Sequence, residues 1–133
     1  MTRKILVVDD DPDIYEAVDM ILTSRGYEVV SAHDGEEGLA ALRAEKPDLM
    51  ILDLLMPRKS GFAVLRELRE SGSDEVRDMP VLILTSVREE ASRRRYELET
   101  GEELDVDAYV EKPISPEILL ERVENLIRKQ QTV

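Results

Sequence analysis

The chain has 133 residues, a length typical of one domain, and 42% of them are apolar, which is enough to build a core. Its formal net charge of −12 argues against direct binding to nucleic acid or to an anionic membrane surface, because both present negative phosphate groups. The absence of cysteine and the single histidine exclude disulfides, thiol chemistry and the usual zinc sites. The first apolar run ends at Asp9, too early for a signal peptide or a membrane span, so we expect a soluble, cytoplasmic domain.

Short aliphatic runs recur five times along the chain, at residues 4–8, 27–32, 48–53, 80–85 and 107–111. Runs of this length are typical of strands that are buried on both faces of a parallel sheet. Stretches with helical spacing lie between them. The alternation predicts an α/β fold with a doubly wound, five-stranded parallel sheet in the flavodoxin-like strand order 2-1-3-4-5. We expect a single domain over residues 1–133, with its core at about 3–129 and no output domain.

Capping residues mark the first two helices. Asp11 precedes a proline and is expected to cap the first helix, which we expect to end at Gly26. Asp34 can cap the second helix, with Glu37 three positions later as in a capping box.

The third and last helices have clear apolar faces. The third is predicted to begin near residues 59–62 and to carry Phe62, Leu65 and Leu68 inward. The last is predicted to begin at Ser115, with Pro116 in its first turn, and to bury Leu119, Val123, Leu126 and Ile127.

The helix expected over residues 87–100 has a weak apolar pattern. Only Val87, Ala91 and Leu98 form an apolar stripe. The basic run 93–95 is interpreted as a solvated helix face, with a docking patch for an acidic partner as the alternative. Because so little apolar area can be buried, we predict that this helix is the least stable element of the fold.

Polar side chains follow the buried strands at their carboxyl ends, which is where ligands bind in doubly wound sheets. The winding reverses between the strands at 4–8 and 48–53. Three carboxylates, two hydroxyls and an ammonium are therefore expected at one edge: Asp9, Asp10, Asp53, Thr85, Ser86 and Lys112. Hard oxygen ligands of this kind suit Mg²⁺. Without a cation, mutual repulsion and burial are expected to raise the pKa of at least one aspartate.

Four fragments, "ILVVDD", "DLMILDLLMP", "LILTS" and "YVEKP", occur in this order and resemble the receiver domain of two-component response regulators, the CheY-like fold. The resemblance covers nearly the whole chain. It implies that Asp53 is the phosphoacceptor. It also implies that Asp10, Asp53 and the backbone carbonyl of Leu55 bind Mg²⁺, with Asp9 acting mainly through water.

The resemblance further assigns the phosphoryl-binding residues and the partners. Lys112 and Thr85, with Ser86 beside them, would bind the phosphoryl group, and Tyr109 would be the aromatic switch. The donor would be a sensor histidine kinase or a phosphotransfer protein. The signal would pass to a downstream protein through the face formed by residues 87–100, 107–111 and the last helix, and homodimerisation on phosphorylation stays open.

We therefore expect a stand-alone phosphoacceptor switch and not an enzyme, apart from self-phosphorylation by small donors and autodephosphorylation. One alternative is a binding scaffold of the same fold that is not phosphorylated. The other is a Mg²⁺-dependent phosphohydrolase, which is disfavoured because Leu55 occupies the position of the second acid that such enzymes use on the leaving group. Asp9 and Asp10 as helix caps, and Tyr109 as a packing residue, are the simpler structural interpretations.

The chain departs from typical receivers in one place. The stretch from Thr85 to Lys112 is a few residues longer than usual, and the extra residues fall around 101–107. They lie next to the expected signalling face, so they bear on how the helix at 87–100 docks and how strongly Tyr109 is coupled to Thr85.

Overall fold

The computed structural model describes residues 2–56, 59–71, 79–101 and 106–131. Its five strands form one sheet in which all neighbours pair in parallel, in the order β2-β1-β3-β4-β5. The strands are β1 (Lys4–Val8), β2 (Glu28–Ala32), β3 (Leu49–Asp53), β4 (Val81–Thr85) and β5 (Ala108–Glu111). The predicted fold class and strand order are confirmed, and each strand begins and ends within one residue of its prediction.

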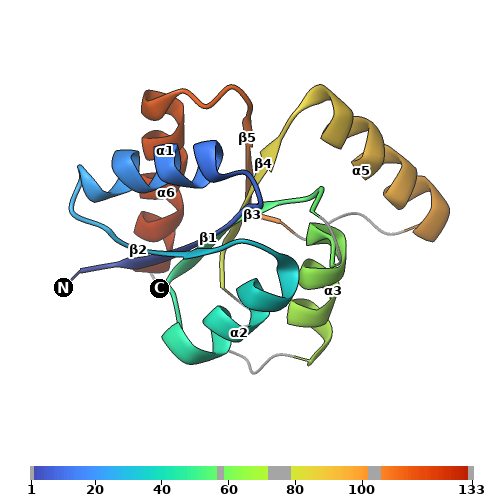
Figure 1. The fold of residues 1–133 in the computed structure, drawn as a ribbon, viewed down its shortest axis with the longest axis horizontal. Coiled ribbons are helices and arrows are strands. Elements are labelled where there is room, and N and C mark those ends of the chain that lie inside the picture. The colour runs from blue at the N-terminus through green and yellow to red at the C-terminus, as the bar shows by residue number, and fades with distance from the viewer. Residues whose placement is uncertain (1, 57–58, 72–78, 102–105, 132–133) are drawn as a thin grey trace.

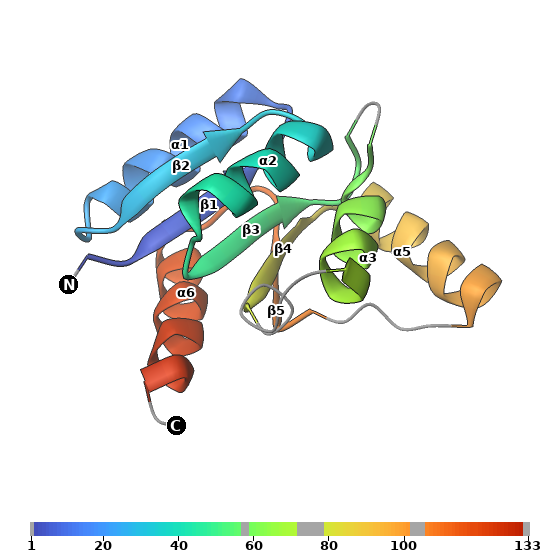
Figure 2. The ribbon, with the colours of Figure 1, turned by 90° about the horizontal axis from the view of Figure 1, so that it is seen from below.

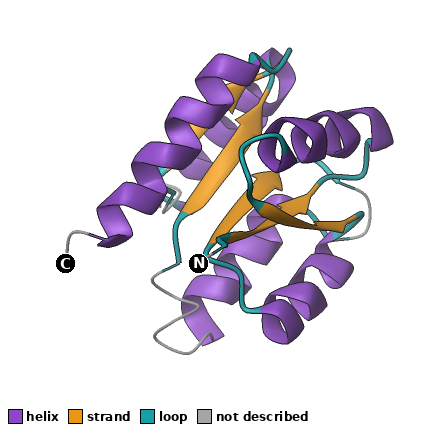
Figure 3. Ribbon diagram, turned by 90° about the vertical axis from the view of Figure 1, so that its left-hand side faces the viewer, coloured by secondary structure: helices purple, strands orange, loops and turns teal. Residues whose placement is uncertain are grey.

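Helices cover both faces of the sheet. They are α1 (Pro12–Thr23), α2 (Gly35–Glu45), α3 (Gly61–Ser71), α5 (Val87–Thr100) and α6 (Pro116–Gln131). Figure 1 shows α1 and α6 on one face and α2 and α3 on the other, and Figure 3 shows the strands between these two layers. In Figure 2, α5 lies beside α3 and extends outward from the sheet. Among the described helices, none combines the length and the apolar character needed to cross a bilayer.

The core consists of two apolar clusters, one on each face of the sheet. Successive side chains of a strand point to opposite faces, so Leu6 and Val8 join the cluster under α2 and α3, whereas Ile5 and Val7 join the cluster under α1 and α6. Every residue of β3 and β4 is buried. This two-sided burial explains why these strands read as continuous aliphatic runs in the sequence.

Side-chain caps fix the beginnings of three helices as predicted. The Asp11 side chain accepts a hydrogen bond from the Asp13 backbone N–H, and the Asp34 side chain accepts one from Glu37. The Ser115 hydroxyl accepts a bond from the Ile118 N–H at 3.4 Å. The predicted end of the first helix was wrong, because α1 ends at Thr23 with Ser24 as its cap.

The expectation that α5 buries little apolar area agrees with its described side chains. Ala91 is exposed and Leu98 is 85% exposed, while the side chain of Val87 lies outside the described residues. Arg94 and Arg95 face solvent, as expected for a solvated face, but Arg93 is only partly exposed. The inward side of α5 is therefore polar, since a stripe of three apolar residues is too thin to decide which face of a helix packs.

Candidate functional site

The parallel register brings the polar residues at the strand ends to one edge of the sheet. Val8 pairs with Leu52, so Asp9 and Asp53 follow at the same level on neighbouring strands. Asp53 pairs with Leu84, and Thr85 pairs with Glu111, the residue before Lys112. Four strands therefore deliver their terminal polar groups to a common edge.

Three carboxylates form an acidic cluster at this edge. One carboxylate oxygen from each of Asp9, Asp10 and Asp53 lies within 4.8 Å of the other two. Asp9 and Asp53 are buried, with 0% and 3% exposure, whereas Asp10 is exposed. Backbone amides hold the buried pair, since Asp11 donates to Asp9 Oδ1 at 2.9 Å and Leu55 donates to Asp53 Oδ1 at 3.4 Å. The cluster thus has two fixed members and one open to solvent.

Lys112 faces the cluster from the loop after β5. Its Nζ lies 3.6 Å from Asp53 Oδ1 and 3.7 Å from Asp9 Oδ2. Its backbone N–H donates to the Thr85 carbonyl at 2.7 Å, which ties the loop to the end of β4. One ammonium offsets only part of the charge of three carboxylates, so the edge remains acidic.

Burial raises the pKa of Asp9 to about 6. The hydrogen bond from the Asp11 amide and the charge of Lys112 lower this pKa, and the charges of Asp53 and Asp10 raise it. Loss of hydration outweighs the favourable contacts because Asp9 is fully enclosed. The expectation that one aspartate of the cluster has a raised pKa is confirmed.

The acidic cluster fits a hard divalent cation. Asp9 Oδ2 is buried and accepts no hydrogen bond, although such an atom normally has a donor. A cation between the three carboxylates would supply the missing partner and relieve the repulsion among them. Asp9, Asp10 and Asp53 offer the oxygen ligands that Mg²⁺ prefers, and Mg²⁺ keeps several waters of its own.

The remaining predicted site residues lie on the β4–β5 side of this edge. Thr85 is buried and its hydroxyl donates to the Ser86 carbonyl at 3.3 Å, while Ser86 itself is half-buried. Thr85, Tyr109 and Lys112 line one cavity of about 420 Å³. Tyr109 also contacts α5 on its other side, so it connects the site with that helix.

The structure adds Gly61, which the sequence indicated only as part of a helix start. A Cβ atom at this position would overlap the Asp53 carbonyl oxygen and lie 2.7 Å from the Leu54 Cα. The Gly61 N–H donates to the Leu54 carbonyl at 2.9 Å, which closes the loop after β3 directly over Asp53. The Gly61 backbone can approach the backbone of Asp53 and Leu54 this closely only because glycine has no side chain. The available sequence signal was a glycine soon after the aspartate that ends a buried strand.

Lys59 is a second addition, and it lies in the same loop. Its Nζ is 2.6 Å from Glu67 of α3 and 3.4 Å from Glu36 of α2. The lysine therefore links the loop after β3 to two helices. No sequence signal could have found it, because its partners come from separate elements.

The comparisons with known proteins agree with this geometry. The family model of the response regulator receiver domain matches residues 5–124. The chain belongs to this family. "Probable transcriptional regulator ycf27" of Cyanophora paradoxa is 42% identical over 127 residues, covering 96% of this chain and 49% of that protein. "Response regulator MprA" of Mycobacterium bovis is 40% identical over 129 residues, covering 97% of this chain and 52% of that protein. The chain thus spans about half the length of these curated relatives.

Solved structures give the same result for the fold. A signal receiver domain of a histidine kinase from Syntrophus aciditrophicus superposes with a TM-score of 0.83 at 30% identity, covering 99% of this chain and 95% of that one. The chemotaxis protein CheY4 of Vibrio cholerae superposes with a TM-score of 0.79 at 28% identity, covering 95% and 99%. The CheY-like, flavodoxin-type fold is therefore established for this chain.

Proposed function

We propose that this receiver domain accepts a phosphoryl group on Asp53 in a Mg²⁺-dependent reaction and signals by a change of conformation. The observation that carries the proposal is the meeting of the Asp53 carboxylate with two other aspartates and with Lys112 Nζ at 3.6 Å. The donor is a phosphohistidine of a sensor kinase or phosphotransfer protein, or a small phosphodonor. The reaction takes place in the cytoplasm, where such kinases have their phosphohistidine.

The chemistry needs positioning and charge neutralisation more than acid–base groups, because phosphoryl transfer has a loose transition state. An Asp53 carboxylate oxygen attacks phosphorus while the bond from phosphorus to the donor nitrogen breaks. The cluster of Asp9, Asp10 and Asp53 would hold Mg²⁺, whose charge would offset that of the phosphoryl oxygens. The Leu55 N–H orients the Asp53 carboxylate, and Lys112 places an ammonium 3.6 Å from Asp53 Oδ1, where it can offset negative charge on the phosphoryl group.

The product is a mixed anhydride that water later hydrolyses, which returns Asp53 to its starting state. The chain is then a switch and not an enzyme acting on external substrates. Leu55 supports this distinction, because it offers no acid or base to a leaving group.

The conformational change begins at Thr85. A phosphoryl group brings new acceptor oxygens to the edge of the sheet, and the Thr85 hydroxyl turns to donate to one of them, with Ser86 beside it. Tyr109, which lines the same cavity as Thr85, then moves toward the space that Thr85 leaves. The face formed by α5, β5 and α6 presents this change to a downstream protein, or to a second copy of the chain. Whether the domain acts alone stays a prediction, since its curated relatives are about twice as long.

Incubation with acetyl phosphate and Mg²⁺, followed by intact-mass measurement, tests the proposal. We expect the wild-type chain to gain one phosphoryl group, and Asp53→Asn to gain none. Asp13→Asn, which alters an exposed aspartate of α1, is the matched control and should behave as wild type. Chelation of Mg²⁺ should abolish the gain. Absence of any gain with acetyl phosphate and with phosphoramidate would favour the non-phosphorylated scaffold, and steady phosphate release from phosphoesters would favour the phosphohydrolase.

A further inference from the structure

Helix α5 is attached to the domain differently from the other described helices. Neither apolar cluster contains a described side chain of α5. Among its described side chains, Arg93 and Tyr96 contact the rest of the domain, and they lie three positions apart and therefore share one face of the helix. These two side chains thus attach α5 to the domain, whereas most helices are attached by an apolar stripe.

The first attachment joins α5 to the predicted aromatic switch. The Arg93 guanidinium carbon lies over the Tyr109 ring, 4.8 Å from its centroid, and Nη1 donates to the Tyr109 hydroxyl at 3.3 Å. Glu97, one turn further along α5, lies 3.4 Å from the same nitrogen and offsets its charge. A cation–π contact combined with a hydrogen bond to the same ring fixes both the position and the direction of Tyr109.

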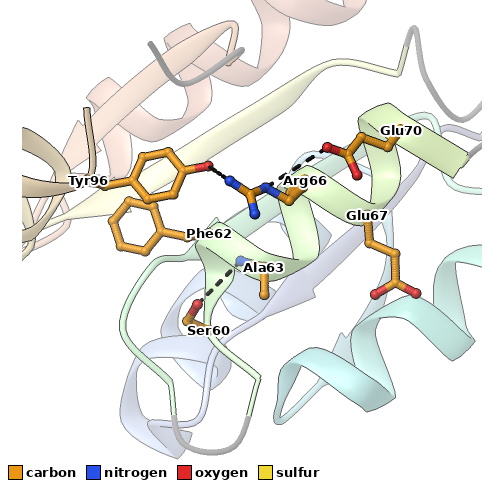
Figure 4. Close-up of a pocket in the computed structure, with 7 residues that line it drawn as sticks. All are labelled: Ser60, Phe62, Ala63, Arg66, Glu67, Glu70 and Tyr96. Carbon is orange, nitrogen blue, oxygen red and sulfur yellow. Dashed lines mark hydrogen bonds and ion pairs between the residues drawn. The ribbon is translucent and has the colours of Figure 1, made fainter. Parts of the chain in front are cut away.

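The second attachment joins α5 to α3. The rings of Phe62 and Tyr96 stack with their centroids 4.8 Å apart, and Arg66 donates to the Tyr96 hydroxyl at 3.3 Å (Figure 4). A cavity of about 590 Å³ lies beside this contact, and its lining residues are Ser60, Phe62, Ala63, Arg66, Glu67, Glu70 and Tyr96. Among the described side chains, a single residue of α5, Tyr96, therefore makes this contact with α3.

Tyr109 therefore lies between two environments. On one side it is bound by Arg93, and on the other it borders the cavity that it shares with Thr85 and Lys112. Movement of the ring toward Thr85 would give up both contacts with Arg93. The strength of those contacts then sets how much of the population has the ring on each side.

We propose that Arg93 is a positioning residue that holds Tyr109 on the α5 side and so opposes activation of the switch. The inference rests on the proposed function, since it concerns the same switch. When the phosphoryl group draws Thr85 and then Tyr109 inward, Arg93 loses its ring and its acceptor. Helix α5 then loses the attachment through Arg93 and shifts about the attachment through Tyr96.

Titration with beryllofluoride, a phosphoryl mimic, in the presence of Mg²⁺ tests this role. Arg93→Ala should lower the half-saturating concentration by roughly three- to tenfold, because removal of a contact of this kind shifts the equilibrium toward the inward ring. Arg94→Ala is the matched control, since it removes the same charge from the exposed side of the same helix, and it should bind as wild type. Arg93→Lys keeps a cation near the ring and should fall between wild type and Arg93→Ala.

A second measurement separates this role from a general effect on folding. In a Tyr109→Leu background, Arg93→Ala should no longer change the half-saturating concentration, because Arg93 acts through the ring. Amide NMR shifts of α5 should respond to beryllofluoride in the wild-type chain, and Arg93→Ala alone should already move them toward the bound values. Equal affinities for wild type, Arg93→Ala and Arg94→Ala would overturn the inference while leaving the phosphoacceptor function intact. Failure of the wild-type chain both to bind beryllofluoride and to gain a phosphoryl group would overturn both.

Discussion

The two helices that flank β5 are held in opposite ways. Helix α6 buries five aliphatic side chains against the sheet: Leu119, Leu120, Val123, Leu126 and Ile127. Helix α5 buries none among its described residues, and it is held by Arg93 and Tyr96. Aliphatic side chains that leave the core would be exposed to water, which is unfavourable. A cation that leaves an aromatic ring can instead be hydrated or bind another group, so the contact of Arg93 with Tyr109 is easier to break.

The same contrast divides the site. Asp53 ends β3 and Asp9 directly follows β1, two interior strands of the sheet, and both side chains are buried. Tyr109 lies on β5, the edge strand, where its ring is in contact with Arg93 of α5. The two buried aspartates of the site thus lie in the firmly packed interior of the sheet. Tyr109, the predicted aromatic switch, lies at the edge of the sheet, beside a helix that can move at a lower cost in free energy.

One leucine-to-alanine substitution in each helix would test this contrast directly. Leu119→Ala should lower the free energy of unfolding by about 2–5 kcal/mol, because it opens a cavity in a fully buried position of α6. Leu98→Ala, the matched change on α5, should alter it by less than about 0.5 kcal/mol, because that side chain is 85% exposed. Urea unfolding of both variants measures the difference, and equal losses would show that α5 is packed as firmly as α6.

The pH dependence of the free energy of unfolding should reveal the cost of burying the charged Asp9 carboxylate. In the folded chain the pKa of Asp9 is raised from 3.8 to about 6, so folding binds a proton between these values and stability falls as the pH rises through them. Without a divalent cation, Asp9→Asn should therefore unfold at higher denaturant concentration than wild type at pH 8. The gain should approach about 3 kcal/mol, since each pKa unit corresponds to about 1.36 kcal/mol.

The same comparison at pH 4 supplies the control. There the buried carboxyl group is protonated in the folded chain, so the advantage of Asp9→Asn should largely disappear. Asp13→Asn, at an exposed position, should show no such difference between the two pH values. A gain that is the same at pH 4 and pH 8 would mean that the charge of Asp9 is not what costs stability.

Much of this molecule could be predicted from the sequence because its signals are local. Caps such as Asp11 and Asp34 act on backbone groups two or three residues away, and aliphatic runs report burial on both faces. The site residues could be predicted as a set because parallel register converts the end of each strand into one edge of the sheet. Their roles came from the resemblance to receiver domains and stay predictions.

What could not be predicted depends on contacts between distant elements. Arg93 reads as one member of a basic run, and only the tertiary structure separates it from its exposed neighbours by bringing it over Tyr109. Lys59 has its two partners on different helices. The effect of the extra residues around 101–107 on docking cannot be judged, since residues 102–105 lie outside the described part of the chain.

Amide hydrogen exchange gives the finest test of the contrast between the two helices. Because α5 lacks buried apolar contacts among its described side chains, its local opening should cost less free energy than that of α6. We expect interior amides of α5 to exchange at least roughly tenfold faster than those of α6, which corresponds to a difference of about 1.4 kcal/mol. Arg93→Ala should widen this gap and Arg94→Ala should not, because Arg93 contacts Tyr109 of β5 whereas Arg94 is exposed. Slower exchange in α5 than in α1 and α6 would mean that the contacts of Arg93 and Tyr96 hold the helix as firmly as an aliphatic face does.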